Sequence, residues 1–158
     1  MKTKTKYILM AIIVAAALAV DLVSKHLFSN ISYTRVLPYI IAFQTNGGNT
    51  GAAFGIFSKS ITFLIVTSVL IVCAMILADV ILKIKGKIYT MGFSLIIAGA
   101  IGNFIDRIWL GYVRDFIMFD FWKTFPIFNF ADCCIVIGAI MVCFHFIFLS
   151  KAVNNGNN

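Results

Sequence analysis

The stretch FNFADCCIVIGAIMVCFHFIFLS, residues 128–150, decides which kind of molecule this sequence can form. After Asp132 the stretch carries no charged side chain, and His145 is its only titratable base. A helix rises about 1.5 Å per residue, so the stretch is long enough to cross the roughly 30 Å hydrocarbon core of a bilayer. It therefore predicts a transmembrane helix with a carboxylate at its start.

The composition of the whole chain agrees with a membrane protein. Of its 158 residues, 61% are hydrophobic and 12% are charged. We predict an all-α polytopic membrane protein, a single domain over residues 1–158, with four transmembrane helices. Apolar windows of roughly 20 residues place these helices at about 7–28, 60–82, 88–105 and 131–150.

The N-terminal segment MKTKTKYILMAIIVAAALAV also has the pattern of a secretory signal peptide, with a small-x-small site from Ala17 to Ala19. Three further spans follow it, and Asp21 and Lys25 would be unusual residues directly after a cleavage site. We therefore interpret the segment as the first transmembrane helix.

Basic residues predict the orientation in the membrane. Lysines occupy the bare N-terminal tail, the short segment 83–87 and position 151, whereas the bases on the other side alternate with Asp106, Asp115 and Asp120. This pattern predicts cytoplasmic termini. The net charge of +7 favours contact with anionic membrane lipid over binding of nucleic acid.

Cysteine and histidine give no metal-binding pattern. All four cysteines lie in apolar runs without a CxxC spacing, and His26 and His145 stand apart. We interpret the cysteines as buried small hydrophobic residues and the histidines as packed or interfacial side chains. No metal and no cofactor is predicted.

The chain contains no glutamate, and its six aspartates differ in their predicted depth in the membrane. Helix arithmetic places Asp21, Asp106 and Asp132 near one membrane boundary, whereas Asp79 lies at the opposite end, where Lys83 is an i,i+4 partner. Asp132 by itself could simply cap a helix. That explanation does not cover the polar residues at the same depth, which are Asn103, Asp106, Arg107, Asp115 and Asn129. Their density predicts a functional site.

The segments between the spans predict a small extracytoplasmic β cradle. Residues 36–46 are rich in β-forming side chains, residues 47–55 form a glycine-punctuated turn, and residues 111–119 have an extended pattern. On an extended strand, Arg114 and Asp115 would point in opposite directions. If Asp115 faces inward, Arg114 meets solvent or lipid headgroups; the sequence leaves the orientation of Arg114 open.

Five motifs occur in order along the chain: DLVSK (21–25), GGNTGAAFG (47–55), GNFIDR (102–107), YVRDF (112–116) and FNFAD (128–132). With these motifs the chain resembles bacterial lipoprotein signal peptidase, or signal peptidase II, from the first helix into the fourth. Arg114 departs from the family pattern, in which an apolar residue precedes the first catalytic aspartate.

The resemblance implies an aspartic endopeptidase of the bacterial cytoplasmic membrane with its active site at the outer face. Its substrates would be diacylglyceryl-modified prolipoproteins, cut N-terminal to the lipid-modified cysteine, and globomycin-type inhibitors would bind it. Asp115 and Asp132 would be the catalytic pair. The supporting and substrate-binding positions implied are Asp21, Lys25, Asn49, Gly51, Asn103, Asp106, Arg107, Asn129 and Ala131.

Two carboxylates at one site suit this chemistry, because one stays protonated while the other activates a water molecule. Other classes fit less well. A rhomboid-type GxSG motif and a presenilin-type GxGD motif are missing from the sequence. A proton-coupled transporter would place its acids near the bilayer midplane, and a scaffold would use its charged pairs only to join helices.

Overall fold

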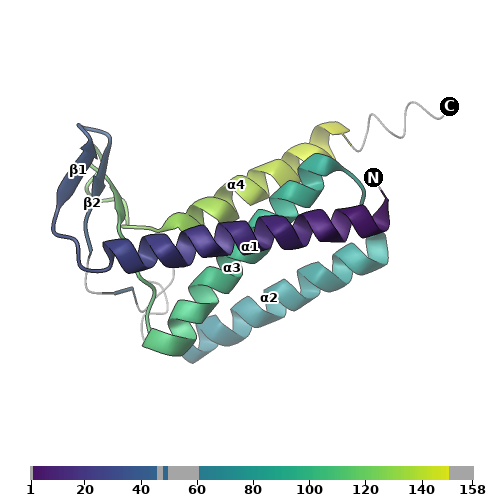
Figure 1. Ribbon diagram of the computed structural model, residues 1–158, viewed down its shortest axis with the longest axis horizontal. Coiled ribbons are helices and arrows are strands. Elements are labelled where there is room, and N and C mark those ends of the chain that lie inside the picture. Colours follow the sequence, from purple (N-terminus) through teal and green to yellow (C-terminus); the bar gives the residue numbers. More distant parts are fainter. Residues whose placement is uncertain (1, 46–47, 50–60, 150–158) are drawn as a thin grey trace.

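The computed structural model describes residues 2–45, 48–49 and 61–149. Four long helices run along one another, and a small sheet lies at one end of the bundle (Figure 1). The helices are α1 (Thr3–Phe28), α2 (Ile61–Leu82), α3 (Lys87–Leu110) and α4 (Phe130–Phe144), and a π-helical turn, η2 (His145–Leu149), continues α4. All four are long and apolar enough to cross a membrane, which confirms the predicted fold class.

Two helices extend beyond the apolar windows of the sequence. α1 begins at Thr3 and α3 continues to Leu110, because the charged residues that ended the windows are paired inside the protein. Lys6 and Asp106 are both buried beside opposite charges. α3 ends where Gly111 adopts a φ of 77°, a left-handed conformation that glycine accepts readily.

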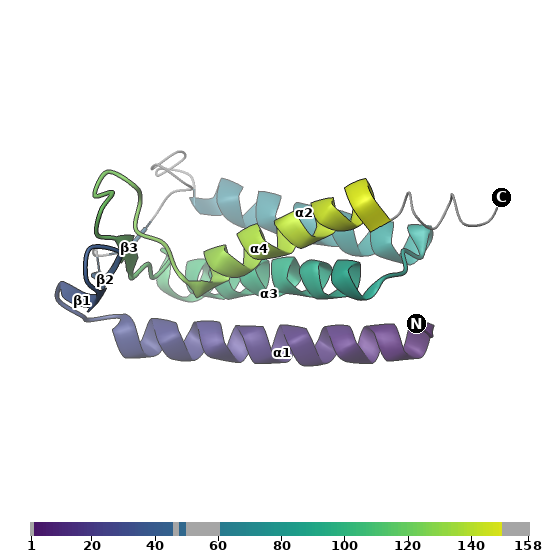
Figure 2. The ribbon, with the colours of Figure 1, turned by 90° about the horizontal axis from the view of Figure 1, so that it is seen from above.

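α3 is the central helix of the bundle. More than half of the residues in its membrane-spanning segment are buried, whereas few residues of α1, α2 and α4 are buried. Figure 2 shows α3 between α1 and α4. The contact with α4 is close at Gly92, where an added Cβ would lie 2.7 Å from the carbonyl oxygen of Gly138. Small residues let two helix backbones approach, which is how helices commonly associate in membranes.

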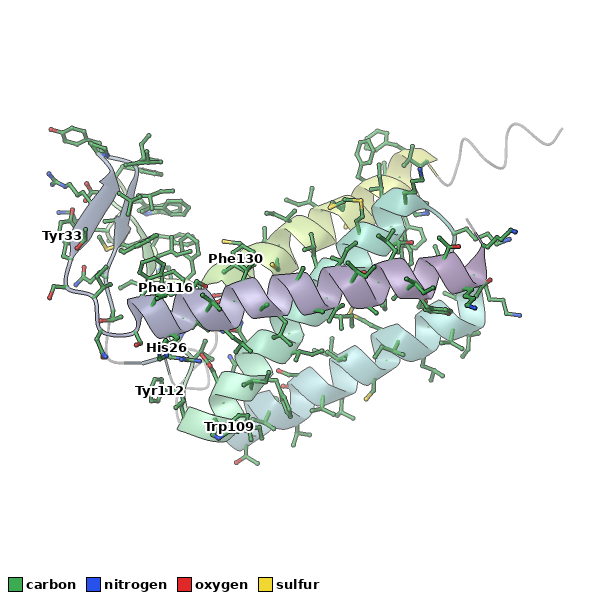
Figure 3. The ribbon with its side chains drawn as sticks, in the orientation of Figure 1. His26, Tyr33, Trp109, Tyr112, Phe116 and Phe130 are labelled. Atoms are coloured by element: carbon green, nitrogen blue, oxygen red, sulfur yellow. The ribbon has the colours of Figure 1, made fainter. Side chains whose placement is uncertain are left out.

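The sheet contains three short antiparallel strands in the order β1 (Thr34–Leu37), β2 (Ile41–Phe43) and β3 (Ile117–Phe119). On β2, Ala42 is fully buried opposite Met118 of β3. The rings of Phe28, Phe43 and Phe116 pack together with centroids 4.5 to 5.6 Å apart. This aromatic cluster attaches the sheet to the end of α1, where Figure 3 labels Phe116.

The opposite end of the bundle corrects one prediction. We expected Asp79 to form an interfacial pair with Lys83, but Asp79 is buried and its Oδ1 lies 2.5 Å from the Nζ of Lys6. Lys6 also donates to the carbonyl oxygen of Ile84 at 3.0 Å. The partner comes from α1 because the helices pack side by side, a relation that spacing within α2 does not reveal.

The cysteines differ in burial. Cys134 is buried as predicted, but Cys73 and Cys143 are exposed on the outward faces of α2 and α4. An apolar run in a membrane protein can face lipid as well as a core, so the general expectation of burial was wrong. Among the described residues, no group of three or more metal-ligating side chains occurs.

Candidate active site

Lys25 is the centre of a buried polar cluster at the sheet end of the bundle. Its side chain is wholly buried, and its Nζ lies 2.8 Å from Asp21 Oδ2, 2.9 Å from Asn103 Oδ1 and 3.5 Å from Asp106 Oδ2. Asp21 Oδ1 in turn accepts the backbone N–H of Ala131 at 2.9 Å. One ammonium group therefore ties α1 to α3, and its partner carboxylate ties α1 to α4.

The start of α4 places Asp132. Asn129 is the N-cap residue, and its Oδ1 accepts the backbone N–H of Asp132 at 3.0 Å, while Asp132 Oδ2 accepts the backbone N–H of Asn129 at 3.1 Å. This reciprocal pair is a capping box. The other oxygen of Asp132 accepts a hydrogen bond of 2.8 Å from the amide of Asn103. Asp132 thus caps the helix and also belongs to the polar cluster.

Asp115 lies on the extended segment before β3, between two amides. Its Oδ2 accepts from Asn49 Nδ2 at 2.8 Å, and its Oδ1 accepts from Asn129 Nδ2 at 2.6 Å. Asn129 also donates to Asn103 Oδ1 at 3.1 Å. Asp115 and Asp132 are therefore connected through two asparagines, which hold both carboxylates in one hydrogen-bonded network.

Both carboxylates open into a cavity of about 510 Å³. Its polar wall also contains Asn49, Asn103 and Arg107. The remaining wall comes from the extended segment before β3, from β3, from the segment after it and from α4. It consists of Val113, Phe119, Phe125, Pro126, Ile127, Phe128, Cys133, Ile135, Val136 and Ile137. A largely apolar cavity with a few convergent polar groups is the usual form of a binding site for an apolar ligand.

The electrostatic setting of Asp115 differs from that of an ordinary surface carboxyl. Burial raises the pKa of Asp115 to about 6, and the negative charge of Asp132 acts in the same direction. Hydrogen bonds from Asn49 and Asn129 oppose this rise in pKa. Asp115 therefore keeps a proton to a much higher pH than a solvated aspartate, as one member of a carboxylate pair should.

The sequence left the orientation of Arg114 open. Its side chain is 22% exposed, and its Nη2 lies 2.6 Å from Oδ1 of the buried Asp106 carboxylate. Burying a carboxylate without a counter-charge costs folding free energy, and Arg114 supplies a positive charge next to Asp106. Asp115 faces the cavity.

The structure brings the predicted site residues together from α1, α3, the extended segment and the start of α4, and Asn49 joins them from the chain between β2 and α2. Only Gly51 lies outside the described residues. Sequence reasoning missed the apolar wall of the cavity, although the aromatic segment KTFPIFNF, residues 123–130, was a signal for it. It also missed the contact between Arg114 and Asp106, because no local spacing rule joins a helix end to an extended segment.

Comparison with known proteins identifies the family of the chain. Residues 13–148 match the family model described as Signal peptidase (SPase) II. The chain is 40% identical over 151 residues to a lipoprotein signal peptidase of Enterococcus faecalis, covering 93% of this chain and 92% of that protein. It is also 40% identical over 141 residues to a lipoprotein signal peptidase of Mesorhizobium japonicum, covering 85% and 82%. A solved bacterial membrane enzyme is similar with a TM-score of 0.80 at 31% identity, over 92% of this chain and 90% of that one. The chain therefore belongs to the signal peptidase II family.

Proposed function

We propose that Asp115 and Asp132 are the catalytic pair with which this chain, as an aspartic endopeptidase, removes signal peptides from prolipoproteins. The observation that carries the proposal is the joint position of the two carboxylates. Asn129 and Asn103 bridge them at the polar wall of an otherwise apolar cavity. Such a cavity suits a substrate with both a peptide bond and acyl chains.

The pair divides the work of hydrolysis. The raised pKa of Asp115 makes it the member that holds the shared proton, and Asp132 acts as the base. Asp132 takes a proton from a water molecule as the water oxygen attacks the scissile carbonyl carbon, and Asp115 donates its proton to the carbonyl oxygen. When the tetrahedral species collapses, the C–N bond breaks, the leaving nitrogen takes a proton from Asp132, and one hydroxyl of the species returns its proton to Asp115 as the C=O bond re-forms.

Substrate selection follows from depth in the membrane. Asp132 begins α4, so the pair lies at one end of the spans. A diacylglyceryl group on the cysteine after the scissile bond partitions into lipid with about 0.8 kcal/mol per buried CH₂ and holds the bond at that depth. Cleavage then occurs N-terminal to that cysteine. Globomycin-type inhibitors, implied by the family resemblance, would occupy the same cavity and exclude the substrate.

Orientation completes the proposal. Exposed lysines cluster at the end opposite the cavity, at Lys2 and Lys4 and on the turn that carries Lys83 and Lys85. The first residues of α1 and the end of α4 lie at that same end (Figures 1 and 2). Positive residues remain on the cytoplasmic side, so the termini are cytoplasmic and the active site and β cradle face outward. The enzyme is thus a multi-pass protein of the bacterial cell membrane.

The test is cleavage of a diacylglyceryl-modified prolipoprotein by the purified full chain in detergent, compared with the unmodified precursor. The modified substrate should be cut much faster. Asp115→Asn and Asp132→Asn should each lower kcat by at least about a hundredfold, because each variant loses a proton-transfer group. Near-normal turnover by either variant would exclude the pair.

Asp120→Asn is the matched control. Asp120 accepts a hydrogen bond of 2.6 Å from the hydroxyl of Tyr33 and pairs with Arg35 on the outer side of the sheet. An asparagine keeps the acceptor for Tyr33, and the half-exposed Arg35 guanidinium remains solvated when its partner is neutral. This variant should retain the kcat of the unsubstituted chain.

A further inference from the structure

Arg114 and Asp106 form the most fully paired contact of the active-site cluster. Asp106 is completely buried. Its carboxylate is contacted by both the backbone N–H and the guanidinium of Arg114. The backbone N–H of Arg114 donates to Oδ2 at 3.0 Å, Nη2 donates to Oδ1 at 2.6 Å, and Nε lies 3.2 and 3.3 Å from the two oxygens. This is a two-pronged arginine–carboxylate contact, which defines direction as well as distance.

The contact has an electrostatic part. Asp21 and Asp106 are both buried near a single ammonium group, that of Lys25, which lies 2.8 Å from Asp21 and 3.5 Å from Asp106. Two carboxylates would thus share one cation. Arg114 supplies a second positive charge, so that Asp21, Lys25, Asp106 and Arg114 together carry no net charge, which favours their burial.

The contact also has a geometric part, because Arg114 immediately precedes Asp115. The extended segment is held at Val113 by paired backbone hydrogen bonds to Asn49 of 2.8 and 2.9 Å, and at Phe116 by a backbone hydrogen bond to Phe128 of 3.0 Å. Between these points, Arg114 points to α3 and Asp115 points into the cavity. Arg114 is not among the residues that line the cavity, so it can act only through its neighbour.

We infer that Arg114 is a positioning residue. Its two-pronged contact with Asp106 fixes the backbone at residue 114, and this places the Asp115 carboxyl next to the scissile bond. This inference rests on the proposed catalytic role of Asp115. A displacement of about 1 Å at a catalytic group can cost about a hundredfold in rate. Since Arg114 does not contact the substrate cavity, its loss changes kcat and leaves KM in place.

The experiment separates positioning from charge balance with three variants of the full chain, assayed on lipid-modified prolipoprotein. Arg114→Leu should lower kcat at least about tenfold with KM within about twofold. Arg114→Lys keeps the charge but not the planar fork, so its thermal stability should stay near that of the unsubstituted chain while kcat falls. The double variant Arg114→Leu with Asp106→Asn restores neutrality and retains an oxygen for the backbone N–H of residue 114. It should recover thermal stability but not kcat.

Three results would overturn the inference: an unchanged kcat in Arg114→Leu, full kcat in Arg114→Lys, or recovery of kcat in the double variant, which would leave charge balance as the whole role. Asp115→Asn, measured in the same assay, distinguishes this failure from failure of the proposed function. If Asp115→Asn is inactive while the Arg114 variants are normal, only the positioning role is lost. If Asp115→Asn retains turnover, the catalytic assignment fails and the positioning role fails with it.

Discussion

At the scale of single residues, the proposed role of Asp115 predicts the pH response of the enzyme. Its pKa is raised from 3.8 to about 6 by burial and by the charge of Asp132, so it ionises as the pH rises through about 6. Above that pH both members of the pair carry negative charge, and the proton for the carbonyl oxygen is missing. We therefore predict that kcat/KM falls as the pH rises through the upper apparent pKa of the pair in the free enzyme, near 6.

The amide of Asn49 provides the control for this prediction. It donates to the Asp115 carboxylate and lowers the pKa of that carboxyl. Asn49→Ala removes the donor, so the alkaline limb should move to higher pH, in addition to any loss of activity. Profiles of kcat/KM from about pH 4 to about pH 9, recorded for the unsubstituted chain and for Asn49→Ala, give the position of the alkaline limb in each protein. An unmoved limb would mean that Asp115 is not the group that titrates there.

At the scale of secondary-structure elements, α2 depends on one buried charge pair. Among the described residues of α2, only Leu64 and Asp79 are buried, and Asp79 is bound to Lys6 of α1. Asp79→Asn leaves the Lys6 ammonium without its counter-charge, and breaking a buried pair commonly costs about 3 kcal/mol or more. We predict a clear loss of thermal stability in detergent with little change in kcat, because the pair lies at the opposite end from the cavity.

Lys83→Gln is the matched control. If Asp79 were paired with Lys83 instead of Lys6, this variant would lose as much thermal stability as Asp79→Asn. Lys83 is exposed, and Lys6 occupies the Asp79 carboxylate, so this variant should leave the melting temperature nearly unchanged. A combined Lys6→Met and Asp79→Leu variant should recover stability, since apolar replacement of a buried pair is often neutral or favourable. Equal losses in Lys83→Gln and Asp79→Asn would contradict the assignment.

At the scale of the whole molecule, the two ends of the bundle should face different compartments. Thr34 lies exposed on β1 beside the active-site end, and Lys85 lies exposed on the turn between α2 and α3. In intact cells stripped of any outer barrier, Thr34→Cys should react with a membrane-impermeant maleimide. Lys85→Cys should react only after the membrane is permeabilised. The unsubstituted chain measures the background from its own cysteines, and the reverse labelling pattern would invert the proposed orientation.

The sequence by itself determined the four spans, because roughly 20 consecutive apolar residues cannot remain in water as an open chain and form helices in lipid. It also determined the residues of the polar cluster. Asp21, Asp106 and Asp132 lie at matching depths because the rise of a helix converts residue number into distance. The β-forming segments likewise predicted the small sheet, since their composition and glycine punctuation are local properties.

Only the tertiary structure decided which charges pair. Asp79 pairs with Lys6 and not with Lys83, and Asp106 pairs with Arg114 as well as with Lys25. Spacing rules describe neighbours on one helix, but in a low-dielectric interior a buried charge is stabilised by whichever opposite charge the packing brings nearest. The cavity next to Asp115 and Asp132 also depends on how the elements pack together. Most of its apolar wall comes from α4 and the segment after β3, and no pattern within either of these two parts of the sequence shows that they meet.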